Sequence, residues 1–131
     1  MSTATEKFNK KYIEVVKTIK NNFADLKAGE KMLISSPRSI ANYVAKIPYG
    51  TEKSVKLMRR ELAENADAHN TCPLTCGVFL RIAIEASIEQ SNGAKPDLPF
   101  WRVINRNSSL IKKLPISQKY LTELRNSEGL Q

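Results

Sequence analysis

Apolar residues recur along most of the chain at spacings of three and four, which is the period of an amphipathic α-helix. The first run covers residues 6–28, where Phe8, Tyr12 and Phe23 alternate with lysines. Gly29 follows the run, and glycine is the residue that most often ends a helix. The pattern therefore predicts one long amphipathic helix over residues 6–28.

Four more helices are predicted from residues typical of helix N-termini. Ser36, followed by proline, caps a short helix that ends before Pro48, and Ser54 begins another. Pro73 stands in the first turn of a fourth helix, whose sequence LTCGVFLRIAIEASI is apolar on nearly every side. Ser117 begins the last helix. We expect the fourth helix to be central and buried, because it has almost no polar face to present to solvent.

The sequence between the fourth and the last helix predicts a short β-hairpin. Residues 91–97 have the composition of a loop, and the apolar segments 99–104 and 109–111 are separated by NRNS. Several helices followed by a hairpin and a helix is the order of a winged helix-turn-helix domain. We therefore expect a mainly α fold with a small β-hairpin (α+β), in which residues 1–31 form an N-terminal helical extension and residues 32–131 a winged-helix-like domain.

Composition adds one strong signal, a net charge of +8 with a pI near 9.6. The 131 residues are 41% hydrophobic and 26% charged, which is ordinary for one globular domain. Lysines concentrate in residues 1–31, whereas residues 71–97 hold two basic residues against three acids. The charge favours a polyanionic partner, nucleic acid rather than a membrane surface, and places the basic footprint on the neighbours of the fourth helix.

The sequence contains no signal peptide and no apolar stretch of transmembrane length. We therefore expect no membrane contact, a cytoplasmic protein (nucleoid-associated, or nuclear in a eukaryote) and a monomer. Cys72, Cys76 and His69 are too few for a closed zinc site, so no metal and no cofactor are predicted. We interpret the two cysteines as free thiols and the histidine as exposed in a polar loop.

Four stretches of the chain resemble a known family when they are taken together. They are IANYVAKIPYG, SVKLMRREL, PFWRVI and YLTELRNSEG. In this order they resemble the DNA-binding domain of alkylguanine-DNA alkyltransferases and, more closely, their non-enzymatic relatives, the alkyltransferase-like proteins. The resemblance covers residues 34–129, about three quarters of the chain, and its most specific part is the Pro-x-x-Arg-Val core at residues 99–103.

In the alkyltransferases this core is Pro-Cys-His-Arg-Val, where the cysteine accepts the alkyl group and the histidine helps to deprotonate it. A thiolate is the side chain suited to displacing an alkyl group from carbon. Phe100 stands at the cysteine position and Trp101 at the histidine position. The alkyltransferase-like proteins usually have tryptophan in place of the cysteine and retain the histidine, so this chain departs from both patterns. The resemblance implies a protein that is not an enzyme and transfers no alkyl group.

The resemblance also implies a helix-turn-helix that enters the minor groove of double-stranded DNA, with a nucleotide rotated into a pocket beside Pro99, Phe100, Trp101 and Arg102. An aromatic ring could stack on the rotated base. Trp101 is either such a ring or a core residue, and Arg102 is either a buried strut or a phosphate contact. Adjacent residues of a strand point to opposite faces, so at most one of the two rings is expected to face the pocket.

The candidate DNA contacts lie on the two helices of the motif and in the hairpin. The basic ones are either phosphate contacts or a solvated face. The spacing of the family's arginine finger is not reproduced, and its base-rotating tyrosine would fall near Ser54 or Val55. The candidate DNA contacts of this chain are Lys56, Arg59, Arg60, Thr75, Arg81, Lys112 and Lys113.

Three functions are compatible with the sequence. The first is a non-enzymatic DNA-binding protein that senses alkylated or distorted bases for DNA repair, with a repair protein as a further partner. The second is a protein-interaction adaptor or transcriptional regulator on a winged-helix scaffold that has lost lesion recognition. The third, an enzyme that uses Cys72 or Cys76, is the least favoured, because neither thiol has a partnered base at fixed spacing.

Overall fold

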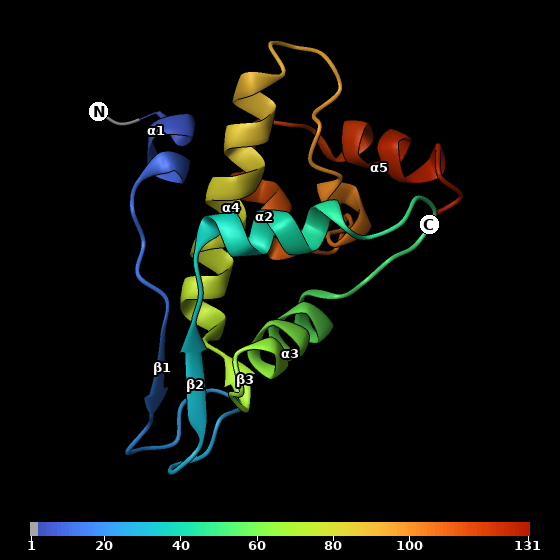
Figure 1. Cartoon of the computed structure of the whole chain (residues 1–131). Coiled ribbons are helices and arrows are strands. Elements are labelled where there is room, and N and C mark those ends of the chain that lie inside the picture. The colour runs from blue at the N-terminus through green and yellow to red at the C-terminus, as the bar shows by residue number, and fades with distance from the viewer. Residues whose placement is uncertain (1–2) are drawn as a thin grey trace.

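Helix α4 (Pro73–Gln90) runs through the centre of the molecule, and the other elements pack around it (Figure 1). The structure is a computed structural model that describes residues 3–131, so the first two residues of the expected N-terminal extension lie outside it. The remaining elements are α1 (Ala4–Asn9), β1 (Val15–Thr18), β2 (Lys31–Ile34), α2 (Pro37–Ala45), α3 (Val55–Asn65), β3 (Asn70–Thr71), the 3-10 helices η1 (Phe100–Arg102) and η2 (Ser109–Lys113), and α5 (Gln118–Asn126).

The predicted second, third, fourth and last helices are confirmed. Their serine caps act as expected, since the hydroxyl groups of Ser36, Ser54 and Ser117 each accept a hydrogen bond from a backbone N–H of the first turn. Helix α4 buries Leu80, Ala83, Ile84 and Ala86 in its middle turns, but its ends are open: Leu74 and Val78 are 68% and 52% exposed, and Glu89 and Gln90 are exposed at the other end. The prediction of a buried central helix is therefore correct for its middle turns and wrong for both of its ends.

The long N-terminal helix is wrong. Helix α1 ends at Asn9, and the chain then forms β1, a turn and β2. The adjacent β-branched Val15 and Val16 pair with β2 in antiparallel register, while Ile19 packs in a small separate core. Apolar spacing alone could not distinguish one long helix from a short helix followed by strands. The apolar residues do recur at helical spacing, but Val15 pairs with β2 whereas Ile19 packs in the small core. Gly29, with a φ of 92°, belongs to the turn between the strands.

A three-stranded sheet in the order β1-β2-β3 lies beside the N-terminal end of α4 (Figure 1). Strand β2 pairs antiparallel with β1 and parallel with the two residues of β3. The coarse expectation of a mixed α and β fold is confirmed, although the strands come from the N-terminal third of the chain and from the residues just before α4.

The predicted hairpin is also wrong, because residues 99–104 and 109–111 form η1 and η2 instead of paired strands. Local hydrogen bonds replace a ladder: the Val103 and Ile104 N–H groups both donate to Phe100 O. A strand would direct alternate residues to solvent. Here every residue from Leu98 to Ile104 except Arg102 is buried, so a tight turn inside the core suits the segment better than a half-exposed strand.

Candidate nucleic-acid interface

The two aromatic rings of the Pro-x-x-Arg-Val core are both buried. Phe100 and Trp101 are 0% and 2% exposed, and their rings meet edge to face with centroids 5.4 Å apart. Lys95 covers the indole, with Nζ 5.0 Å from the ring centroid. Pro99 is buried as well. Neither ring faces an open pocket, so the expectation that one of them could stack on a rotated base is wrong for this conformation.

Glu128 joins the Pro-x-x-Arg-Val core to the C-terminal end of the chain. Its side chain is 0% exposed, and it accepts hydrogen bonds from Trp101 Nε1 at 2.7 Å and from Arg102 Nε and Nη2 at 2.8 Å each. The backbone N–H of Gly50 donates a further bond at 2.9 Å. Arg102 Nη1 donates to Ile47 O at 2.7 Å. Arg102 is therefore a largely buried strut, with its side chain 13% exposed, which corresponds to the first of the two alternatives that its sequence position left open.

The environment of Glu128 keeps it ionised. The Arg102 guanidinium lowers the pKa of Glu128 most, and the Gly50 N–H and the Trp101 indole lower it further. Together they outweigh burial, which raises it, and hold the pKa at about 2.

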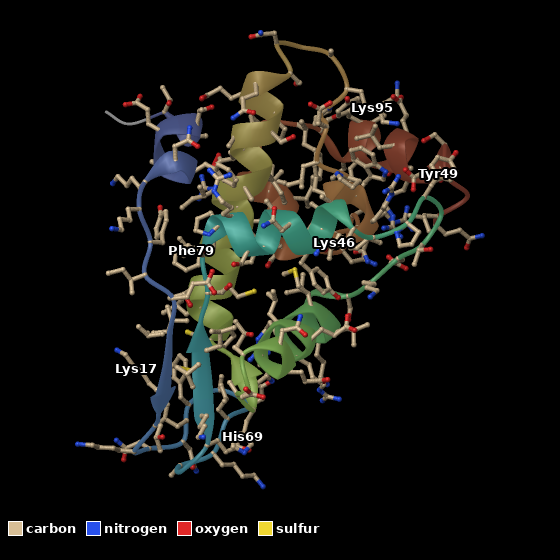
Figure 2. All side chains as sticks on the ribbon, in the orientation of Figure 1. Lys17, Lys46, Tyr49, His69, Phe79 and Lys95 are labelled. Atoms are coloured by element: carbon tan, nitrogen blue, oxygen red, sulfur yellow. The ribbon has the colours of Figure 1, made fainter. Side chains whose placement is uncertain are left out.

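The C-terminal end of α5 is also held against the loop after α2, since Tyr49 donates its hydroxyl to Ser127 O at 2.7 Å (Figure 2).

Arg125 is a second buried strut next to this network. Its Nη1 donates to Trp101 O at 2.7 Å and to Ile104 O at 3.1 Å, so it binds one carbonyl within the Pro-x-x-Arg-Val segment and one just after it. Its Nη2 pairs with Glu52 at 2.6 Å. Arg102, Arg125 and Glu128 thus hold the turn at residues 99–104 through side-chain hydrogen bonds, because this segment has no backbone pairing with a strand.

The basic residues of α3 divide between surface and interior. Lys56 and Arg60 are exposed and take part in no ion pair within residues 3–131. Arg59 is 8% exposed, donates to Thr71 O at 3.0 Å and binds both carboxylate oxygens of Asp25. This contact lowers the pKa of Asp25. The Arg59 guanidinium is therefore engaged inside the fold and is not presented to a phosphate.

A groove of about 860 Å³ runs along the exposed face of α4 and is bounded by η2, α1 and the start of α3. Its wall on α4 includes the small or apolar residues Leu74, Gly77 and Val78, and also the charged residues Arg81 and Glu85. Lysines line it from two other elements, Lys7 of α1 and Lys113 of η2.

The candidate DNA contacts around the groove differ in their exposure and in whether they already have an ion-pair or hydrogen-bond partner. Lys112 and Lys113 are exposed on η2. Arg81 lines the groove but pairs with Glu85 at 3.1 Å. The hydroxyl of Thr75, one residue past Leu74, is buried and has no hydrogen-bond partner among residues 3–131. Among the lysines, Lys7 and Lys113 thus line the groove as exposed cations that belong to no ion pair of residues 3–131.

A smaller cavity of about 390 Å³ adjoins the groove and shares Val55 and Ser108 with it. Val103 of the Pro-x-x-Arg-Val core and Asn105 line the cavity, together with Glu52 and Ser54. The core motif therefore reaches an open space through Val103 and not through its aromatic pair.

The cysteines and the histidine do not form a reactive cluster. Cys72 and Cys76 are free thiols, buried at 4% and 0% exposure, and burial raises the pKa of Cys76 to about 11. His69 is exposed, and its Nδ1 accepts a hydrogen bond from the Lys31 N–H at 2.9 Å. No group of three or more potential metal ligands occurs in the described part of the chain.

Sequence reasoning missed the groups that hold this region together. Glu128, Arg125 and Asp25 carried no pattern that marked them, because an ion pair between distant segments leaves no periodic signal in the sequence. The one available hint was the dense arginine content near Trp101 and α5, since buried guanidinium groups need carboxylate or carbonyl partners.

Comparisons of this chain with protein-family models, with curated proteins and with solved structures find no match. Within residues 3–131, no helix is both long enough and apolar enough to span a lipid bilayer.

Proposed function

We propose that this chain is a non-enzymatic DNA-binding protein of the alkyltransferase-like type, which binds double-stranded DNA through the groove on α4. The observation that carries the proposal is the groove along α4, whose lining includes Leu74, Gly77 and Val78 of the helix and two lysines of neighbouring elements, Lys7 and Lys113. The net charge of +8 supports the same partner.

The chemistry of this face suits the minor groove better than the major groove. Minor-groove proteins press small and apolar side chains against the floor of the groove, while cations contact the phosphates on either side. Gly77 and Val78 are short enough to let the α4 backbone approach closely. Base-edge reading in the major groove would instead require exposed Arg, Asn or Gln along the helix, and the arginine of this face is paired with Glu85.

The absence of alkyl transfer belongs to the same proposal. Phe100 and Trp101 carry neither a nucleophile nor a base, and both are buried. The two thiols are buried too, and the raised pKa of Cys76 leaves it protonated near neutral pH. An enzyme that uses these cysteines is therefore disfavoured by access as well as by the lack of a base.

The base pocket of the proposal moves from the aromatic rings to the neighbouring cavity. Val103 and Asn105 line that cavity beside the Pro-x-x-Arg-Val core. Its volume of about 390 Å³ lies within the range of small-ligand sites. Sensing of an alkylated or distorted base would take place here, without the aromatic stacking expected from the sequence.

The proposal predicts binding to duplex DNA that weakens steeply with salt. Fluorescence anisotropy titrations at two salt concentrations, with matched duplexes that contain guanine or O6-alkylguanine, measure both binding and lesion preference. We expect nanomolar to micromolar binding at low salt, a tighter complex with the alkylated duplex, and an unchanged intact mass of the protein afterwards. Failure to bind either duplex at low salt would refute the proposal, and a gain of one alkyl group in mass would refute its non-enzymatic part.

A second candidate function is a protein-interaction adaptor or regulator. Leu57, Leu74 and Val78 are large apolar side chains exposed near the N-terminal ends of α3 and α4, and exposed apolar groups in one region often mark protein contacts. The adaptor function predicts a stable protein complex that survives nuclease treatment and that a carboxylate at Val78 abolishes. Under the first proposal, the same change weakens DNA binding.

A further inference from the structure

Strand β1 forms a free edge of the three-stranded sheet. The strand order is β1-β2-β3, and β1 pairs with β2 alone, so its outer side meets no other strand within residues 3–131 (Figure 1). Three of its four residues, Val16, Lys17 and Thr18, are exposed. An exposed strand edge presents unpaired backbone N–H and C=O groups, which can pair with the backbone of another chain.

The hydrogen bonds of the sheet show which backbone groups of β1 are unpaired. The Ile19 N–H donates to Glu30 O at 3.0 Å, and these two residues lie opposite each other when the register of β1 and β2 is continued. Opposite residues of antiparallel strands alternate between pairs that exchange backbone hydrogen bonds and pairs that do not. Val16 and Thr18 therefore belong to pairs of the second kind, and their N–H and C=O groups point away from β2.

Strand β2 gives independent evidence for this assignment. Leu33 lies opposite Val16, and its carbonyl accepts a hydrogen bond at 2.8 Å from the Cys72 N–H, on the side of β2 that faces away from β1. The carbonyl of Lys31, which lies opposite Thr18, accepts a bond on the same side. No hydrogen bond joins Val16 or Thr18 to a segment outside the sheet within residues 3–131, so the edge is open.

The surface around this edge is basic. Residues 15–34 hold four lysines and two acids, Asp25 and Glu30. Both acids are engaged, since Asp25 pairs with Arg59 and Glu30 accepts a hydrogen bond from a backbone N–H of its own turn at 2.7 Å. The four lysines are exposed and belong to no ion pair of the described chain. They are Lys17, Lys20, Lys27 and Lys31.

We propose that the edge of β1 binds an extended acidic segment of a partner protein, which adds to the sheet as a fourth strand. The unpaired backbone groups of Val16 and Thr18 supply the hydrogen bonds of this strand addition. Lys17 and Lys20 attract the carboxylates of the added strand. The side chains of Ile13 and Val16, 77% and 42% exposed, supply apolar contacts for its other residues.

The charge of the edge favours an acidic strand over a second copy of this chain and over DNA. A second copy would bring two lysine-rich edges together, and like charges on paired strands are destabilising. DNA phosphates would meet the lysines but also the outward carbonyls of β1, which repel an anion. The inference goes beyond the proposed function, because no residue of β1 or β2 lines the α4 groove.

The test is a titration of the ¹⁵N-labelled full chain with a ten-residue peptide of alternating valine and glutamate. A twin peptide of alternating valine and lysine is the reference. We expect saturable amide shifts in residues 13–20 with the glutamate peptide only, and slower hydrogen exchange of the Val16 and Thr18 amides in the complex. Equal affinity for the two peptides, or shifts that leave out residues 13–20, would overturn the proposal.

Two variants separate the backbone contribution from the charge. Val16→Pro removes an N–H that points away from β2, so it leaves the pairing of β1 with β2 in place and should weaken the glutamate peptide at least tenfold. Lys17→Glu combined with Lys20→Glu keeps the backbone and should reverse the preference between the two peptides. Lys46→Glu combined with Lys119→Glu, the same charge change at exposed positions outside the sheet, should retain the preference. Unchanged affinity in a folded Val16→Pro variant, or equal effects of the two double variants, would contradict the proposal.

Two further measurements identify other occupants of the edge. Shifts in residues 13–20 that grow with protein concentration and need no peptide would indicate a second copy. A short duplex that shifts these amides more than those of α4 would indicate DNA. Either result would overturn the choice of an acidic peptide, whereas failure of the duplex to bind, with peptide binding intact, would count against the proposed DNA function alone.

Discussion

Replacing Glu128 with glutamine is expected to lower the free energy of unfolding by about 3–5 kcal/mol, the usual cost of removing one partner from a buried ion pair. The carboxylate accepts four hydrogen bonds from three residues, and the Arg102 side chain beside it is only 13% exposed. A neutral amide leaves the Arg102 charge uncompensated and presents an NH₂ group where donors already converge. Glu123→Gln, on an exposed position of the same region, should cost less than about 0.5 kcal/mol.

Urea denaturation at neutral pH measures the difference between these variants. Because the folded-state pKa of Glu128 is depressed to about 2 from an ordinary value of 4.5, its stabilisation is fully present above pH 4.5 and is lost as the pH falls toward 2. The gap between wild type and Glu128→Gln should therefore narrow over this range. A gap below 1 kcal/mol at neutral pH, or one that stays constant in acid, would contradict the role assigned to Glu128.

Replacing Val78 with glutamate is expected to weaken duplex binding about a hundredfold at low salt. The side chain is 52% exposed in the wall of the α4 groove, so the change leaves the core intact. A carboxylate there would face the DNA phosphates and bases, and like charges brought together across an interface cost several kcal/mol. Because 1.4 kcal/mol corresponds to a factor of ten, a hundredfold loss is a modest expectation.

Gln90→Glu is the matched control for this variant. It makes the same change in net charge on the same helix, at an exposed position at the opposite end. Anisotropy titrations of both variants should show normal binding for Gln90→Glu, and thermal unfolding should show that both are folded. Equal losses in the two variants would mean that net charge alone governs binding, and no loss in Val78→Glu would remove α4 from the interface.

The helices could be predicted from the sequence where a cap and an apolar stripe agree. Ser36, Ser54 and Ser117 each mark a helix start that the structure confirms, because the capping hydrogen bond depends only on residues three positions apart. The start of α4 at Pro73 follows from local preference in the same way. Local signals of this kind are readable because both partners lie in one short segment.

The N-terminal strands and the two 3-10 helices could not be predicted, because distant contacts decide them. Val15 and Val16 become a strand by pairing with residues 33 and 34. The turn at Phe100 is stabilised by Glu128 and Arg125 from the far end of the chain. For the same reason the sequence could not separate Arg59, which meets Asp25 inside the fold, from its exposed neighbour Arg60.

The candidate site was predictable in its outline only. The helix pair, the lysines of η2 and the place of the Pro-x-x-Arg-Val core were expected from the sequence, and the structure puts Val103 at the cavity next to the α4 groove. The direction of each ring was not predictable, since it depends on whether residues 99–104 form a strand or a turn. The aromatic pair belongs to the core, and the exposed apolar residues of α4, Leu74 and Val78, take its place as the surface of interest.

The most direct test of DNA binding through α4 is a map of amide chemical-shift changes in the ¹⁵N-labelled chain on addition of a short duplex. We expect the largest changes in residues 73–82 of α4 and residues 108–113 around η2, with little change in α2. Changes confined to α2 or α5, or no saturable change at low salt, would contradict the proposed interface.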